Sequence, residues 1–204
     1  MFRIFEHGTA EYASALATLA TRGEADLARV EPDVRRILDA VRTRGDAAIA
    51  EFTAKFEGRD VPRAKLDDDA WRAAAKTVDA GVRHALTVAR DRIAAYHAHQ
   101  RDPGFRTESD GVLLGQRVRP VAAAGVYAPG GKARYPSSVL MTAVPAKVAG
   151  VERIVLATPR PTPEILAAAE LAGVTEVIDA GGAQAIGALA FGTATIPRVD
   201  KIVG

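Results

Sequence analysis

The sequence contains no cysteine and no long apolar run, and these two absences narrow the class of protein. Without cysteine, the chain can neither form disulfide bonds nor bind a metal through thiolates. No apolar stretch approaches the roughly 18 residues that a membrane-spanning helix needs. The first residues show no secretory or organellar targeting signal. These features favour a cytoplasmic protein of one or two domains within the 204 residues, with no membrane partner.

Concentrated charge is also missing from the chain. The formal net charge is +2, and only 5% of the residues are aromatic. Basic residues alternate with Asp and Glu along the sequence, so no stretch forms a basic arm. Nucleic-acid binders usually carry a concentrated basic face. A nucleic acid is therefore not expected as a partner.

Residues 1–119 predict a helical region with a short β segment. Apolar residues recur at steps of three and four between residues 31 and 58, as on one face of a helix. Gly45 divides this stretch into two helices, and Asp46 is expected to be the N-cap of the second. The same spacing over residues 67–100 predicts one long helix with one buried stripe.

Residues 120–204 predict a Rossmann-like unit that is incomplete at its C-terminus. Extended segments are expected at 112–118 and 122–127, and further strands at 153–159 and 176–182, with helices at 138–149, 162–173 and 183–192. Alternating strands and helices with short connections indicate parallel strands joined by right-handed crossovers. The last residues resemble the approach to another strand. The expected fold class is α/β, with a helical N-terminal region followed by an incomplete parallel βαβ sheet.

The stretch from Tyr127 into the following helix is typical of a ligand-binding loop. It follows a strand, and open α/β sheets bind ligands beyond the carboxyl ends of their strands. The aromatic ring of Tyr127 can pack on a flat ligand and its hydroxyl can donate a hydrogen bond. Gly130 and Gly131 allow the backbone to approach a ligand closely, and Lys132 and Arg134 add positive charge. Ser137 or Ser138 can cap the next helix, whose N-terminal amides favour an anion. The alternative is an ordinary tight turn with a capping serine, and neither a dinucleotide fingerprint nor a P-loop motif fits.

A second Gly-Gly turn, at residues 181–182, follows the last predicted strand of the alternating region. Gln184 lies in the first turn of the helix after it, from where its amide can reach the same cleft as Tyr127. An amide offers a donor and an acceptor together, which suits a ribose or a carboxamide. The alternative, which position alone favours, is a solvated first-turn glutamine.

No catalytic or metal-ligating residue stands out from the sequence. The four histidines are expected at the surface, because none has an acidic partner at metal-ligand spacing: His7, His84, His97 and His99. No G-x-S-x-G nucleophile motif is present, and no pair of carboxylates stands apart from the solvated helix charges. The residues alone therefore predict a binding cleft without an evident catalytic group.

Two long segments closely resemble histidinol dehydrogenase. They are "GVYAPGGKARYPSSVLMTAVPAKVAGV" at 125–151 and "GGAQAIGALAFGTATIPRVDKIVG" at 181–204, and "VRTRGDAAIAEFTAKFEG" at 41–58 is also similar. The resemblance implies a zinc-dependent homodimer that oxidises L-histidinol to L-histidine in two NAD-dependent steps, completing histidine biosynthesis. It implies that Tyr127 and Gln184 contact NAD.

Members of that family are about twice as long as this chain. The family's third NAD contact, its zinc ligands and its Glu-His acid/base pair belong to the part that is missing here. The resemblance thus implies a fragment carrying part of the NAD site, inactive alone. The alternative is a non-catalytic NAD-binding or assembly module completed by a partner chain. A relative of aldehyde dehydrogenases is disfavoured, because those enzymes need a catalytic cysteine.

Overall fold

The computed structural model describes residues 3–21, 24–130 and 135–204. The chain divides into two compact units, Met1–Arg36 and Ile37–Gly204. The division between residues 119 and 120 that the sequence suggests stays a prediction. Within the described part of the chain, no helix combines the length and the apolar character that crossing a membrane requires.

The first unit contains helix α1 (Ala10–Ala20) and the beginning of helix α2 (Glu24–Arg44), which continues into the second unit. Thr9 is the N-cap of α1, and its hydroxyl accepts a hydrogen bond from the Tyr12 N–H at 3.2 Å. This contact satisfies one of the N–H groups that the first turn of a helix leaves without an internal partner. No residue of α1 is buried.

The predicted long helix at 67–100 is wrong, because the structure has two helices there, α4 (Asp68–Ala75) and α5 (Ala80–Ala98). Asp67 caps α4, and Asp79 caps α5 by accepting hydrogen bonds from the N–H groups of Gly81 and Val82. An aspartate in extended conformation that accepts these bonds starts a new helix. The apolar spacing continues across the break, which explains why the pattern alone did not reveal it.

The predicted helix break at Gly45 is confirmed, but the expected N-cap is wrong. Gly45 itself is the N-cap of α3 (Asp46–Glu57), and Asp46 is the first helical residue. The Asp46 carboxylate accepts hydrogen bonds from the Thr193 hydroxyl at 2.6 Å and from the Thr195 hydroxyl at 2.9 Å. Asp46 thus fastens the loop before the last strand to α3 instead of capping its own helix.

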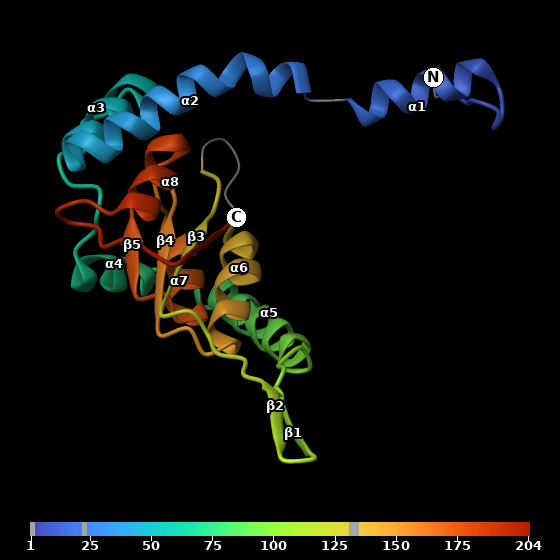
Figure 1. Cartoon of the computed structure of the whole chain (residues 1–204). Helices are drawn as coiled ribbons and strands as arrows, with labels where there is room; N and C mark the ends of the chain where they lie inside the picture. Colours follow the sequence, from blue (N-terminus) through green and yellow to red (C-terminus); the bar gives the residue numbers. More distant parts are fainter. Residues whose placement is uncertain (1–2, 22–23, 131–134) are drawn as a thin grey trace. The chain divides into compact units, whose positions relative to one another are not determined.

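A two-stranded antiparallel hairpin follows α5. Strand β1 (Phe105–Ser109) pairs with β2 (Val112–Gln116), and every residue of both strands is exposed. The extended segment expected at 112–118 is therefore confirmed in a shorter form, whereas β1 was not anticipated. In Figure 1 the hairpin projects from the second unit.

The centre of the second unit is a parallel sheet with the strand order β5-β4-β3-β6. Its strands are β3 (Ala123–Tyr127), β4 (Arg153–Ala157), β5 (Glu176–Ile178) and β6 (Lys201–Val203). The helices between them are α6 (Pro136–Val148), α7 (Pro163–Ala172) and α8 (Gly182–Phe191). The α/β class, the alternation and the expected last strand are all confirmed.

Helices cover both faces of this sheet (Figure 1). One face packs against α4, α5, α6 and α7 through the strand side chains of Val126, Ile154 and Leu156. The other face packs against α3, α8 and the end of α2 through Val155, Ala157 and Ile178. Successive strand residues point to opposite faces, so a strand buried on both sides must be apolar throughout. The run at 154–157 follows this rule, since all four side chains are fully buried.

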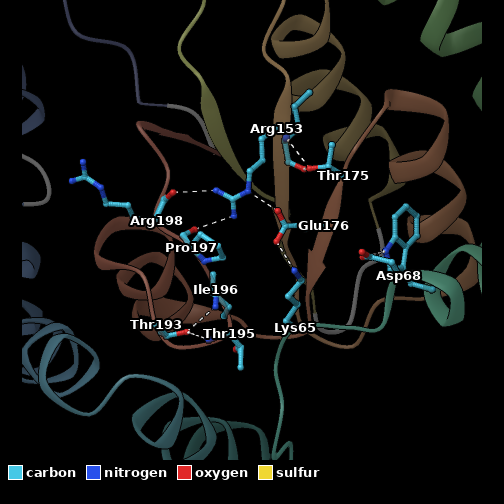
Figure 2. Close-up of polar contacts among 12 residues, drawn as sticks. Lys65, Asp68, Arg153, Thr175, Glu176, Thr193, Thr195, Ile196, Pro197 and Arg198 are labelled. Atoms are coloured by element: carbon cyan, nitrogen blue, oxygen red, sulfur yellow. Dashed lines mark hydrogen bonds and ion pairs between the residues drawn. The ribbon is translucent and has the colours of Figure 1, made fainter.

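A cluster of charged residues holds together the amino ends of β4 and β5 (Figure 2). Glu176 accepts a hydrogen bond from Arg153 Nε at 2.5 Å and forms an ion pair with Lys65 Nζ at 2.8 Å. Arg153 also donates to the carbonyl oxygens of Pro197 and Arg198. Burial raises the pKa of Glu176, but the hydrogen bonds from Arg153 and Lys65 outweigh it and the pKa is lowered. The charged form of Glu176 thus stabilises the folded chain.

We expect Glu176→Gln to lower the free energy of unfolding at neutral pH by about 1–3 kcal/mol, the usual cost of leaving partly buried charged partners unsatisfied. A lowered pKa stabilises the fold above the ordinary glutamate pKa of about 4.3, and the gain disappears as pH falls through the folded value. The difference between the two proteins should therefore shrink in acid. Urea unfolding across this pH range measures it, with Glu152→Gln at an exposed neighbouring position as the control. A difference that stays constant in acid would contradict this account of Glu176.

Candidate functional site

The order of the strands makes the carboxyl end of β3 the place where a ligand-binding crevice is expected. The chain runs from β3 outward through β4 to β5, and then returns across the sheet to β6 on the other side of β3. Helix α6 follows β3 on one face, whereas α8 precedes β6 on the opposite face. In open α/β sheets, ligands bind beyond the carboxyl ends of the strands, where the strand order reverses. Tyr127, the last residue of β3, lies at this position.

Tyr127 meets the amino terminus of α8. The Gly182 N–H, in the first turn of α8, donates a hydrogen bond to the Tyr127 hydroxyl oxygen at 3.2 Å. Because the hydroxyl oxygen accepts this bond, its own proton is left to donate elsewhere. The structure therefore brings together the two segments that the sequence placed in one cleft, and the phenol links them.

Gln184 is buried, with only 2% of its surface exposed. The solvated first-turn glutamine that position alone favoured is therefore wrong. A methyl group built on Gly182 would lie 2.9 Å from Gln184 Oε1, so the amide lies directly against the turn. The amide therefore lies beside the turn whose N–H contacts Tyr127.

Pro159 packs the loops after β3, β4 and β5 against one another. A methyl group on Gly130, in the loop after β3, would lie 2.4 Å from the Pro159 carbonyl oxygen. A methyl group on Gly181, in the loop after β5, would lie 2.9 Å from Pro159 Cγ. Only glycine allows both loops to approach this closely. Pro159 was not identified from the sequence, although it closely follows the buried strand β4.

The loop between β3 and α6 is only partly described. Gly131, Lys132 and Arg134 lie outside the described residues, so their expected part in a ligand site stays a prediction. The expected serine cap is wrong, because Tyr135 is the N-cap of α6 without a capping side chain, and Pro136 opens the helix. Proline suits the first helical position, since its missing N–H would have no partner there.

Charged residues lie beside the loop after β5. Arg59 binds the Asp179 carboxylate with two hydrogen bonds of 2.6 Å each. Hydrogen bonds from Arg59 to Asp179 raise the pKa of Arg59, burial lowers it, and the contact with Glu57 raises it further. The net effect is upward, so Arg59 stays charged. Asp179 directly follows a buried strand, a signal that the sequence carried and that was not used.

The described residues do not fit a zinc site. No cluster of three or more histidine, aspartate or glutamate side chains suited to a metal ion occurs in residues 3–21, 24–130 and 135–204. His7, His84 and His99 are exposed, whereas His97 is partly exposed and contacts the Gln100 side chain. A cavity of about 340 Å³ beside His97 lies at the amino end of β3, the opposite edge from Tyr127.

The sequence matches the family model "Histidinol dehydrogenase" over residues 20–204. The histidinol dehydrogenase of Syntrophotalea carbinolica is 46% identical, covering 100% of this chain and 49% of the relative. That of Aquifex aeolicus is 48% identical, covering 93% of this chain and 45% of the relative. The chain thus spans about half the length of the curated relatives it matches.

A solved structure is also similar. The crystal structure of histidinol dehydrogenase from Elizabethkingia anophelis superposes with a TM-score of 0.79 at 35% sequence identity. The match covers 86% of this chain and 42% of that chain. Fold and sequence therefore agree on the same relatives.

We predict that the effects of Gly181→Ala and Pro159→Ala on the free energy of unfolding are coupled. The methyl group on residue 181 collides with Pro159 Cγ, which Pro159→Ala removes. Gly181→Ala should therefore cost about 1–3 kcal/mol of stability in the natural chain, and at least about 0.5 kcal/mol less in a chain that already carries Pro159→Ala. Urea unfolding of the two single variants and the double variant measures this.

Gly115→Ala is the matched control. Its methyl group would meet the Phe105 carbonyl oxygen in the hairpin, and no atom of Pro159 is among its nearest neighbours. Its cost should persist when Pro159→Ala is also present. Strictly additive effects for residues 159 and 181 would contradict the packing described here.

Proposed function

The chain belongs to the histidinol dehydrogenase family, and we propose that it supplies part of the NAD site of an enzyme that oxidises L-histidinol to L-histidine in two steps. The observation that carries the proposal is the meeting of Tyr127 and α8 at the strand-order reversal. The chain spans about half of its relatives, so the catalytic activity is proposed for the whole enzyme.

The described residues fit a dinucleotide. Gln184 is buried in the first turn of α8, close to the contact with Tyr127, and its amide offers a donor group and an acceptor. The Tyr127 hydroxyl keeps a proton to donate, and its ring offers a flat apolar surface. NAD, when bound, supplies the hydride acceptor, while these residues bind and orient it. The α8 amino terminus adds a positive dipole end, which favours phosphate groups.

No catalytic step is assigned to a residue of this chain. The groups gathered around Tyr127 bind and orient, and none of the described side chains forms a metal cluster. Zinc ligands and the base that removes the substrate proton are proposed for the further part of the enzyme. Homodimeric assembly, the substrate histidinol and a cytoplasmic location are likewise proposals from the family. No observation favours the alternative of a non-catalytic module completed by a partner chain.

Tyr127→Ala and Gln184→Leu should each raise the dissociation constant of NAD at least about tenfold, a loss of about 1.4 kcal/mol. The first change removes the ring and the hydroxyl, and the second removes both hydrogen-bonding groups of the amide. Calorimetric titration of NAD into the purified chain measures the affinity. Tyr96→Ala and Gln100→Leu, at exposed positions near the end of α5, are the matched controls. Equal affinity in Tyr127→Ala and the natural chain would remove Tyr127 from the site.

The chain alone should form no NADH from histidinol. A full-length enzyme that carries these residues as its N-terminal half should form NADH, and absorbance at the NADH band follows both reactions. The physical reason is that the chain offers cofactor contacts without an assigned base. Turnover by the 204-residue chain would overturn the expected inactivity. Absence of turnover in the full-length enzyme would overturn the proposed function.

A further inference from the structure

We propose that the ion pair between Arg59 and Asp179 positions the α8 amino terminus against Tyr127, and so sets the affinity for the dinucleotide. The second half of this inference rests on the proposed function, whereas the first half concerns the chain alone. The hydrogen bonds of Arg59 and Asp179 run to the C-terminal end of α3 and to the loop after β4, and not to Tyr127 or Gln184, so both are positioning residues.

The ion pair has a geometry that fixes direction as well as distance. Arg59 Nη1 and Nη2 each donate to a different oxygen of Asp179, both at 2.6 Å. Arg59 Nε also donates to Glu57 Oε2 at 2.8 Å, so the guanidinium bridges the end of α3 to the loop after β5. The Arg59 and Asp179 side chains are only 21% and 16% exposed. A planar, bidentate and partly buried pair holds both partners in one orientation.

Asp179 also holds the loop after β4. Its Oδ1 accepts a hydrogen bond from the Arg160 backbone N–H at 2.7 Å. Arg160 has φ = +53°, a left-handed conformation that costs a non-glycine residue free energy and needs outside support. The Arg160 side chain donates in turn to the Glu57 carbonyl oxygen. One carboxylate thus ties together the end of α3, the loop after β4 and the loop after β5.

A short stretch of chain separates this anchor from the Tyr127 contact. Asp179 is followed by buried Ala180, by Gly181 against Pro159, and by Gly182, whose N–H reaches the Tyr127 hydroxyl. Pro159 directly precedes Arg160, whose backbone N–H the Asp179 carboxylate binds. The Asp179 carboxylate therefore holds both partners of the contact between Pro159 and Gly181 through neighbouring residues. Release of Asp179 would free the two loops together and withdraw the Gly182 N–H from Tyr127.

A second charged cluster, at the amino end of β5, provides a comparison. Glu176, the first residue of β5, forms a similar partly buried cluster with Arg153 and Lys65. That cluster (Figure 2) lies at the amino ends of β4 and β5, whereas Tyr127 stands at the carboxyl end of β3. Loss of either cluster should lower stability, but only loss of the Asp179 cluster should weaken the contact between Gly182 and Tyr127.

The experiment compares the natural chain with Asp179→Ala, Arg59→Lys and Glu176→Gln. Arg59→Lys keeps the charge but loses the planar fork, and it is the milder change should Asp179→Ala fold poorly. Amide hydrogen exchange at Gly182 is measured by NMR without ligand. NAD affinity is measured by calorimetry, and urea unfolding reports the stability of each variant.

We expect exchange at Gly182 to accelerate at least about tenfold in Asp179→Ala and Arg59→Lys, and the dissociation constant of NAD to rise at least about fivefold. Glu176→Gln should change neither the exchange rate at Gly182 nor the dissociation constant of NAD, even if it lowers the urea midpoint as much as the other two variants do. Exchange at Gly182 within about twofold of the natural chain in folded Arg59→Lys would overturn the inference, as would an equal acceleration in Glu176→Gln. If the natural chain bound no NAD, the proposed function would fall, and the exchange rates would still decide the positioning of α8.

Discussion

The reversal of strand order beside β3 is the constraint on which the rest of the site depends. Strand β3 has β4 on one side and β6 on the other, and the helices that follow and precede these strands lie on opposite faces. Open α/β sheets bind ligands beyond the carboxyl ends of their strands at such a reversal, so a crevice is expected there. Tyr127 stands at that end, and the returning helix α8 brings its first turn to the phenol. A binding surface therefore arises from the topology before any particular ligand is considered.

Short strands make this arrangement depend on what holds their ends. Strand β5 has only three residues, and a charged cluster lies at each end of it. Glu176 ties its amino end to β4 and, through Arg153, to the loop before β6, while Asp179 ties its carboxyl end to α3 and to the loop after β4. Both clusters are partly buried and contain arginine, whose planar fork suits carboxylates. The two clusters differ in role because of their positions. Only the Asp179 cluster lies at the carboxyl end of β5, from which the chain continues to Gly182 and Tyr127.

The alternating strands and helices could be read from the sequence because each depends on local pattern. The apolar run of β4, the proline that opens α7 and the turn before α8 all carry their own signals. Tyr127 could be placed as well, because a strand that ends before a Gly-containing turn puts its last residue at the sheet edge. Those conclusions needed no knowledge of distant contacts.

The remaining features depend on residues far apart in the chain. Asp46 looked like a helix cap, but its partners Thr193 and Thr195 lie 147 and 149 residues later. Gln184 looked solvated because first-turn positions usually are, and its burial follows only from the packing of α8 on the sheet. Arg59 and Asp179 are 120 residues apart, so no spacing rule relates them. The helix break at Asp79 could not be predicted for another reason: the apolar spacing of the sequence continues across it.

The most direct test of a dinucleotide at this crevice is amide hydrogen exchange of the natural chain with and without saturating NAD. The account predicts protection in two segments, 123–130 and 179–186, which carry the end of β3 and the start of α8. Residues 118–122 and 150–153, at the opposite edge of the sheet, should exchange at the same rate in both conditions. Protection at that opposite edge, or none at all under saturating NAD, would contradict the placement of the cofactor at Tyr127 and Gln184.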